Sequence, residues 1–127
     1  MAPPKAFDFT GEVAIVSGAG SRMKGKSMRI QFIHWLYSFQ PLGEIGNGRA
    51  TSIVLARQGA KVALIDHNVE WAQETKRMID EEGGTSEVIE ADVTSEESCK
   101  KAIERTVQLF GTVHILVNVG TNQLEVC

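Results

Sequence analysis

The sequence predicts an α/β fold in which one parallel sheet carries helices on both faces. Three observations support this fold class. Short apolar runs alternate with amphipathic stretches, glycines separate the two kinds of segment, and the connections are short. Connections of this kind between parallel strands are right-handed crossovers. We therefore expect a truncated, doubly wound sheet of about four strands in the order 3-2-1-4.

Each expected element follows from local patterning. The strands are apolar runs ended by glycine or a polar residue, expected at residues 12–17, 61–66, 87–92 and 113–118. The helices are expected at residues 50–58, 69–82 and 94–110. Helical spacing is most regular from Cys99 through Ala102, Ile103, Thr106 and Val107 to Phe110, which predicts a helix with one apolar face and a buried Cys99. Thr94, followed three residues later by Glu97, has the signature of a capping box at the start of that helix.

Composition places the chain among ordinary globular domains. It has 127 residues, of which 43% are hydrophobic and 23% charged, and a formal net charge of −3, which argues against a nucleic-acid-binding surface. No run approaches the roughly 20 apolar residues of a membrane span, and we see no signal peptide. The cysteines, Cys99 and Cys127, fit a reducing compartment better than a disulfide framework. We therefore expect a cytoplasmic protein, and no metal site because no ligand cluster is present.

A glycine turn follows the first expected strand, and an insertion interrupts it. The turn starts at Gly18 and Gly20, and Gly46-Asn47-Gly48 has the form of its continuation into a helix. Glycines let the backbone approach a pyrophosphate, and the helix N-terminus offers N–H donors to it. The 24 residues of the insert, 22–45, separate the two halves. The turn can bind phosphate only if the insert folds away and leaves the halves touching.

An acidic residue ends the second expected strand. Asp66 lies 18 residues after Gly48, close to the spacing of about 20 found in dinucleotide-binding units. A carboxylate here accepts hydrogen bonds from ribose hydroxyls and repels a 2′-phosphate. The pattern predicts a Rossmann-type domain that prefers NAD to NADP. The alternatives are that Asp66 is only a polar strand end, or that the cofactor is a methyl donor.

Three motifs resemble the short-chain dehydrogenase/reductase family. Joined across the insert, Ser17-Gly18-Ala19-Gly20-Ser21-Gly46-Asn47-Gly48 is similar to the family's Thr-Gly-x-x-x-Gly-x-Gly. Ala91-Asp92-Val93-Thr94 resembles the segment after its third strand, and Ile115-Leu116-Val117-Asn118-Val119-Gly120 resembles its fourth-strand Leu-Val-Asn-Asn-Ala-Gly. The resemblance covers about residues 10–120 outside the insert, which corresponds to the N-terminal half of a typical member.

This resemblance implies an NAD-binding fragment of an oxidoreductase whose full-length relatives act on an alcohol or carbonyl and form homo-oligomers. The implied contacts are Gly18, Ser21, Gly46, Asn47 and Gly48 at the pyrophosphate, Asp66 at the adenosine ribose, Asp92 and Val93 at the adenine, and Asn118 at the nicotinamide-side ribose. Asn118 could instead only cap its strand. Family catalysis uses a Tyr-x-x-x-Lys pair with a serine, but the sole tyrosine, Tyr37, is followed four residues later by Pro41. We therefore expect no catalytic residues in this chain.

The insert has no period typical of a helix or a strand, although it holds four of the eight aromatic residues. We interpret residues 26–43 as translated intron. Gly25-Lys26-Ser27 can be encoded with a splice donor and Leu42-Gly43 with an acceptor, and excision removes 18 codons in frame. Residues 121–127 would be read-through of the same kind. The alternative function is a non-enzymatic interaction protein that uses this basic and aromatic segment, or the edge of the fourth strand.

Overall fold

The computed structural model describes residues 7–20 and 46–119. They form a four-stranded parallel sheet with the order β3-β2-β1-β4. The strands are β1 (Val13–Ser17), β2 (Lys61–Asp66), β3 (Thr85–Glu90) and β4 (Ile115–Asn118), and the helices are α2 (Asn47–Arg57), α3 (Val69–Glu81) and α4 (Glu96–Phe110). The fold class and strand order predicted from the sequence are confirmed.

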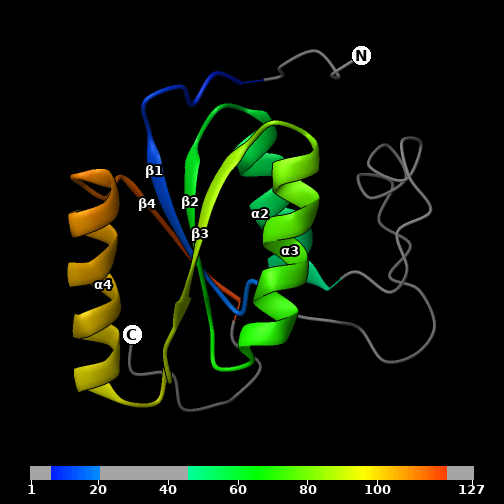
Figure 1. Ribbon diagram of the computed structural model, residues 1–127. Coiled ribbons are helices and arrows are strands. Elements are labelled where there is room, and N and C mark those ends of the chain that lie inside the picture. Colours follow the sequence, from blue (N-terminus) through cyan, green and yellow to red (C-terminus); the bar gives the residue numbers. More distant parts are fainter. Residues whose placement is uncertain (1–6, 21–45, 120–127) are drawn as a thin grey trace.

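Helices cover both faces of the sheet (Figure 1): α2 and α3 lie on one face and α4 on the other. Successive side chains of a strand point to opposite faces, so the two central strands contribute to both cores. Ala14 and Val16 of β1 pack with Ile53 of α2, whereas Ile15 packs with Ala102 of α4. This two-sided burial explains why β1 and β2 are continuous apolar runs.

The apolar face of α4 is only half covered. Ala102 and Thr106 are buried as expected, but Ile103 is 47% exposed and Val107 is 43% exposed. These side chains are exposed because α4 packs mainly against β2 and β3, and the described residues provide no helix over β4 on this face. Leu116 of β4, on the same uncovered side, is 56% exposed.

Helix α4 begins one residue later than the capping-box pattern indicates. Its N-cap is Ser95, whose hydroxyl accepts a hydrogen bond from the Ser98 N–H at 3.3 Å. Thr94 lies in the turn before the helix, where its N–H and its hydroxyl both donate to Asp92 Oδ1, at 2.9 and 2.6 Å. The Asx turn formed by Asp92 therefore displaces the predicted cap.

Several expectations concern single residues or segments. Cys99 is 8% exposed and lies on the covered side of α4, as expected for a small buried side chain. Ser21, the insert 22–45 and the tail 121–127 lie outside the described residues. In the part that is described, no helix is long and apolar enough to cross a bilayer, and no three His, Cys, Asp or Glu side chains cluster as metal ligands.

Candidate functional site

The candidate site lies where the parallel strands end. The strand register aligns Ser17 with Asn118 and Asp66 with Glu90, so the last residues of all four strands meet at one edge of the sheet. Ligands of open α/β sheets bind outside this carboxyl edge. Asp66 and Asn118, two of the residues that the sequence predicts at the cofactor, therefore end their strands at this edge.

The turn after β1 has room only for glycine at two positions. Gly18 has a φ of +69°, in the left-handed region, and a Cβ there would lie 2.6 Å from the Val119 carbonyl oxygen. A Cβ on Gly20 would lie 2.7 Å from the backbone nitrogen of Ala72 in α3. Gly20 is therefore required for close packing of the turn against α3, a role that the motif alone does not reveal.

Asp66 holds this turn in place. Its Oδ2 accepts a hydrogen bond from the Gly20 N–H at 2.9 Å, and its Oδ1 accepts one from the Asn68 N–H at 2.9 Å. The residue is only 7% exposed, and a buried carboxylate needs such donors to offset its desolvation. Each oxygen has more than one acceptor position, so the carboxylate can anchor the turn and still accept a hydroxyl group of a ligand.

The N-terminus of α2 is the second half of the interrupted turn. Gly46 is its N-cap, in extended conformation and without a side-chain capping bond, and its carbonyl accepts the Ala50 N–H at 3.1 Å. No acidic residue lies in the first turn of α2, whereas α3 and α4 begin with side-chain caps and acidic residues. Gly46 and Gly48 are buried and Asn47 is exposed. A helix start without a competing carboxylate suits an anionic ligand.

An apolar cavity of about 210 Å³ opens between the strand ends and α4. Val93 and Asn118 are among its lining residues, together with Ser17 and Ala91, but Gly18 and Asp66 are not. The Ser17 hydroxyl donates to Asn118 Oδ1 at 3.2 Å, and the Val119 N–H donates to Ser17 Oγ at 3.2 Å. These bonds fix the Asn118 side chain at the end of β1. The predicted residues thus occupy two adjacent regions of the strand edge.

Asp92 is exposed at this edge, and hydrogen bonds from Thr94 favour the ionised form of its carboxyl. The hydroxyl and then the N–H of Thr94 lower the pKa of Asp92 below its ordinary value, because both donate to the ionised carboxylate. The ionised Asp92 therefore stabilises the folded turn fully at pH values above the pKa of this carboxyl in the unfolded chain. This contribution is lost as the pH falls through the lower pKa of the folded chain.

We expect Thr94→Val to raise the pKa of Asp92, because the side-chain donor is lost while the backbone donor remains. Titration of the Asp92 carboxyl by NMR checks this, with Thr94→Ser, which keeps a hydroxyl, as the matched control. An unchanged Asp92 pKa in the valine variant would show that the hydroxyl does not contribute.

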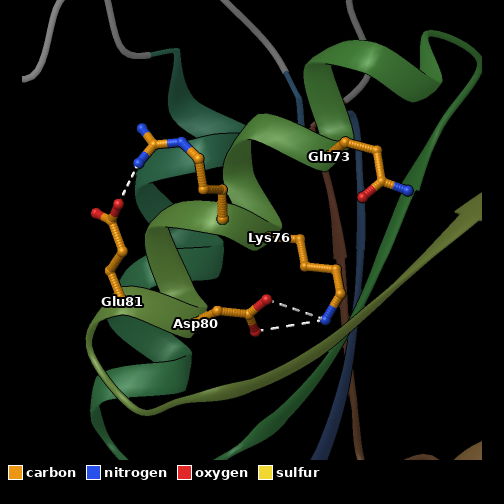
Figure 2. A pocket seen from close by; sticks show the side chains of 5 residues that line it. Gln73, Lys76, Asp80 and Glu81 are labelled. Carbon is orange, nitrogen blue, oxygen red and sulfur yellow. Dashed lines mark hydrogen bonds and ion pairs between the residues drawn. The ribbon is translucent and has the colours of Figure 1, made fainter.

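A larger hollow, of about 400 Å³, lies on the outer surface of α3 (Figure 2). Its polar groups pair along the helix: Lys76 Nζ lies 3.3 Å from Asp80 Oδ2, and Arg77 forms ion pairs with Glu74 and Glu81. Hydrogen bonding to Glu74 and the charges of both glutamates raise the pKa of Arg77. Exposed pairs at these spacings are ordinary features of a solvated helix. We therefore assign the candidate site to the strand edge and not to this hollow.

The parallel order β3-β2-β1-β4, with helices on both faces and a glycine turn after β1, defines a Rossmann-type α/β domain. Comparison with known proteins identifies the family. Residues 43–125 match the family described as short chain dehydrogenase. The chain therefore belongs to the short-chain dehydrogenase/reductase family of oxidoreductases.

Individual relatives agree with this assignment. General stress protein 39 of Bacillus subtilis (strain 168) is 42% identical over 84 residues, which cover 64% of this chain and 29% of the relative. A hydroxysteroid dehydrogenase from Escherichia coli has a TM-score of 0.66 and 25% identity, and the match covers 87% of this chain and 37% of that one. An oxidoreductase from Haemophilus influenza with bound NAD has a TM-score of 0.70, 22% identity and coverages of 94% and 35%, and it supports the fold alone. The chain spans about a third of the length of the curated relatives that it matches.

Proposed function

We propose that this chain is an NAD-binding portion of a short-chain dehydrogenase/reductase. The observation that carries the proposal is Asp66, a buried carboxylate at the end of β2 that anchors the glycine turn and keeps acceptor positions for ribose hydroxyls. The same carboxylate would repel the 2′-phosphate of NADP. Family membership supports a nicotinamide dinucleotide as the ligand.

The described residues fit this cofactor. The turn at Gly18 has no space for a Cβ, and α2 starts without a side-chain cap or an acidic residue. We assign Gly18, Gly46, Asn47 and Gly48 to the pyrophosphate, with Ser21 from outside the described residues, Asp66 to the adenosine ribose, Asp92 and Val93 to the adenine, and Asn118 to the nicotinamide-side ribose. Bound NAD would supply the hydride acceptor for oxidation of an alcohol.

We further propose that the chain by itself does not transfer hydride. The sole tyrosine, Tyr37, has Pro41 where the family motif has lysine, so no Tyr-x-x-x-Lys pair can hold and move the substrate proton. Full-length relatives would act on an alcohol or a carbonyl compound.

Calorimetric titration of the 127-residue chain with NAD tests the proposal. We expect saturable binding at one site, and competition by ADP-ribose, which shares every contact proposed for the adenosine half. No binding of NAD by the folded chain would defeat the proposal. A parallel assay with NAD and simple alcohols should show no NADH absorbance, and turnover would contradict the assignment of inactivity.

A second candidate function is a non-enzymatic interaction protein, and one observation favours it. Ile103, Val107 and Leu116 expose an apolar strip beside β4, and β4 pairs only with β1 among the described strands. Exposed apolar strips and open strand edges associate with other polypeptide surfaces, including a second copy of the same chain.

We expect the wild-type chain to self-associate with rising concentration and Leu116→Lys to weaken this association, because the lysine places a charge at the centre of the strip. Size-exclusion chromatography with light scattering measures both species. Thr112→Lys, at an exposed position in the segment before the same strand, is the matched control for added charge. A wild-type chain that remains monomeric would count against this function.

A further inference from the structure

Thr75 of α3 connects the two halves of the interrupted turn. Its hydroxyl lies 2.9 Å from the carbonyl oxygen of Ala19, in the turn after β1. The hydroxyl oxygen of Thr75 also accepts a hydrogen bond from Nε of Arg49, in the first turn of α2, at 3.0 Å. Thr75 is fully buried and Arg49 is 6% exposed. Two successive hydrogen bonds thus join Ala19, through Thr75, to Arg49 of α2.

The geometry around Arg49 determines where the single proton of the Thr75 hydroxyl goes. Two carbonyls are within reach, that of Ala19 at 2.9 Å and that of Trp71 at 3.3 Å. Arg49 Nη2 donates to the Trp71 carbonyl at 3.0 Å, and Arg49 Nε donates to the Thr75 hydroxyl oxygen. Because Arg49 already donates to the Trp71 carbonyl and the Ala19 carbonyl is the nearer acceptor, the hydroxyl proton binds Ala19 in preference to Trp71.

Another buried threonine shows what happens without the arginine. Thr106 of α4 is also fully buried, and its hydroxyl donates at 2.8 Å to the carbonyl of Ala102, four residues earlier in the same helix. This local bond is the usual choice for threonine inside a helix. The Thr75 hydroxyl instead lies closer to the Ala19 carbonyl, in a different segment, than to the Trp71 carbonyl of its own helix. We attribute this difference from Thr106 to Arg49.

We propose that Arg49 is a positioning residue for dinucleotide binding, because it directs the Thr75 hydroxyl to the Ala19 carbonyl and so keeps the glycine turn in register with the start of α2. The inference rests on the proposed function for the identity of the ligand, NAD. The hydrogen bonds around Thr75 do not depend on that function. The Ala19 N–H donates to the Ile65 carbonyl and the Gly20 N–H to Asp66. The Thr75 bond therefore completes a clamp on both sides of the peptide that joins Ala19 to Gly20.

The test compares Thr75→Val, Thr75→Ser and Thr106→Val with the wild-type chain. Thr75→Val should weaken NAD binding about tenfold, the effect of losing one buried hydrogen bond. Thr75→Ser should restore wild-type affinity, and Thr106→Val should leave it unchanged. Without NAD, the Ala19 and Gly20 amides should exchange with solvent about tenfold faster in Thr75→Val, whereas the Leu64 amide in β2 should be unaffected.

Arg49→Lys tests whether the arginine acts through Thr75, since lysine keeps the charge but cannot direct two donors at fixed angles. We expect the same loss of NAD affinity as in Thr75→Val, and no further loss in the double variant. Equal effects of Thr75→Val and Thr106→Val on amide exchange, or additive effects of the Arg49 and Thr75 changes, would overturn the inference. A wild-type chain that binds no NAD would defeat the proposed function, and amide exchange would still decide the role of Arg49.

Discussion

Replacing Gly18 by alanine should lower the free energy of unfolding by about 3 kcal/mol or more. Two separate costs add at this position. The φ of +69° is strained for any residue with a Cβ, at about 1–2 kcal/mol. In addition, the new methyl group would lie 2.6 Å from the Val119 carbonyl oxygen, so the backbone after β4 must move.

Gly11→Ala is the matched control for this prediction. Gly11 has a φ of +86°, but a Cβ there meets nothing within 4 Å. We therefore expect it to cost only the conformational part, about 1–2 kcal/mol. Equilibrium unfolding in urea measures both variants. Similar losses at Gly18 and Gly11 would show that the turn is not packed against Val119.

Replacing Asp66 by asparagine should weaken NAD binding by about ten- to a hundredfold, the effect of losing charge-assisted hydrogen bonds to the ribose. Binding of NADP should fall less or improve, because the charge that repels its 2′-phosphate is gone. The ratio of the two affinities is the informative quantity. Asp66 also holds the Gly20 N–H, so damage to the turn alone would weaken both dinucleotides equally.

Competition titrations with NAD and NADP measure this ratio. Glu90→Gln is the matched control, since Glu90 is aligned with Asp66 at the end of the neighbouring strand and is exposed. It should leave the preference for NAD unchanged. A parallel loss of NAD and NADP binding in Asp66→Asn would limit Asp66 to a structural role in the glycine turn.

The strand order was predictable because the central strands are recognisable in the sequence. Strands β1 and β2 are buried on both faces, which only a parallel sheet covered on both sides allows. Strand β3 was harder to place: it starts at Thr85, two residues before the expected position, and mixes exposed and buried residues. Its polar residue Glu87 lies in the middle of the strand and not at its start, since pairing with β2 outweighs local propensity.

The site was predictable only in part, because its supports come from tertiary contacts. The glycines and Asp66 were found from their spacing along the chain, and the structure places Asp66 at the end of β2, bonded to Gly20 in the turn after β1. The bond from Gly20 to Asp66, and the link from Arg49 through Thr75 to Ala19, join segments that are distant in sequence. The sequence does show an arginine, Arg49, just before the apolar residues of its helix. No spacing rule predicts that this arginine is buried or that it binds Thr75.

The central claim is that both halves of the interrupted glycine turn form one NAD-binding site. Mapping the backbone amide shifts of the 127-residue chain by NMR during addition of NAD tests it most directly. We predict that Gly18 in the turn after β1, Gly48 at the start of α2 and Asp66 at the end of β2 shift together, with one common dissociation constant. Shifts confined to one half of the turn, or to the outer surface of α3, would contradict the claim.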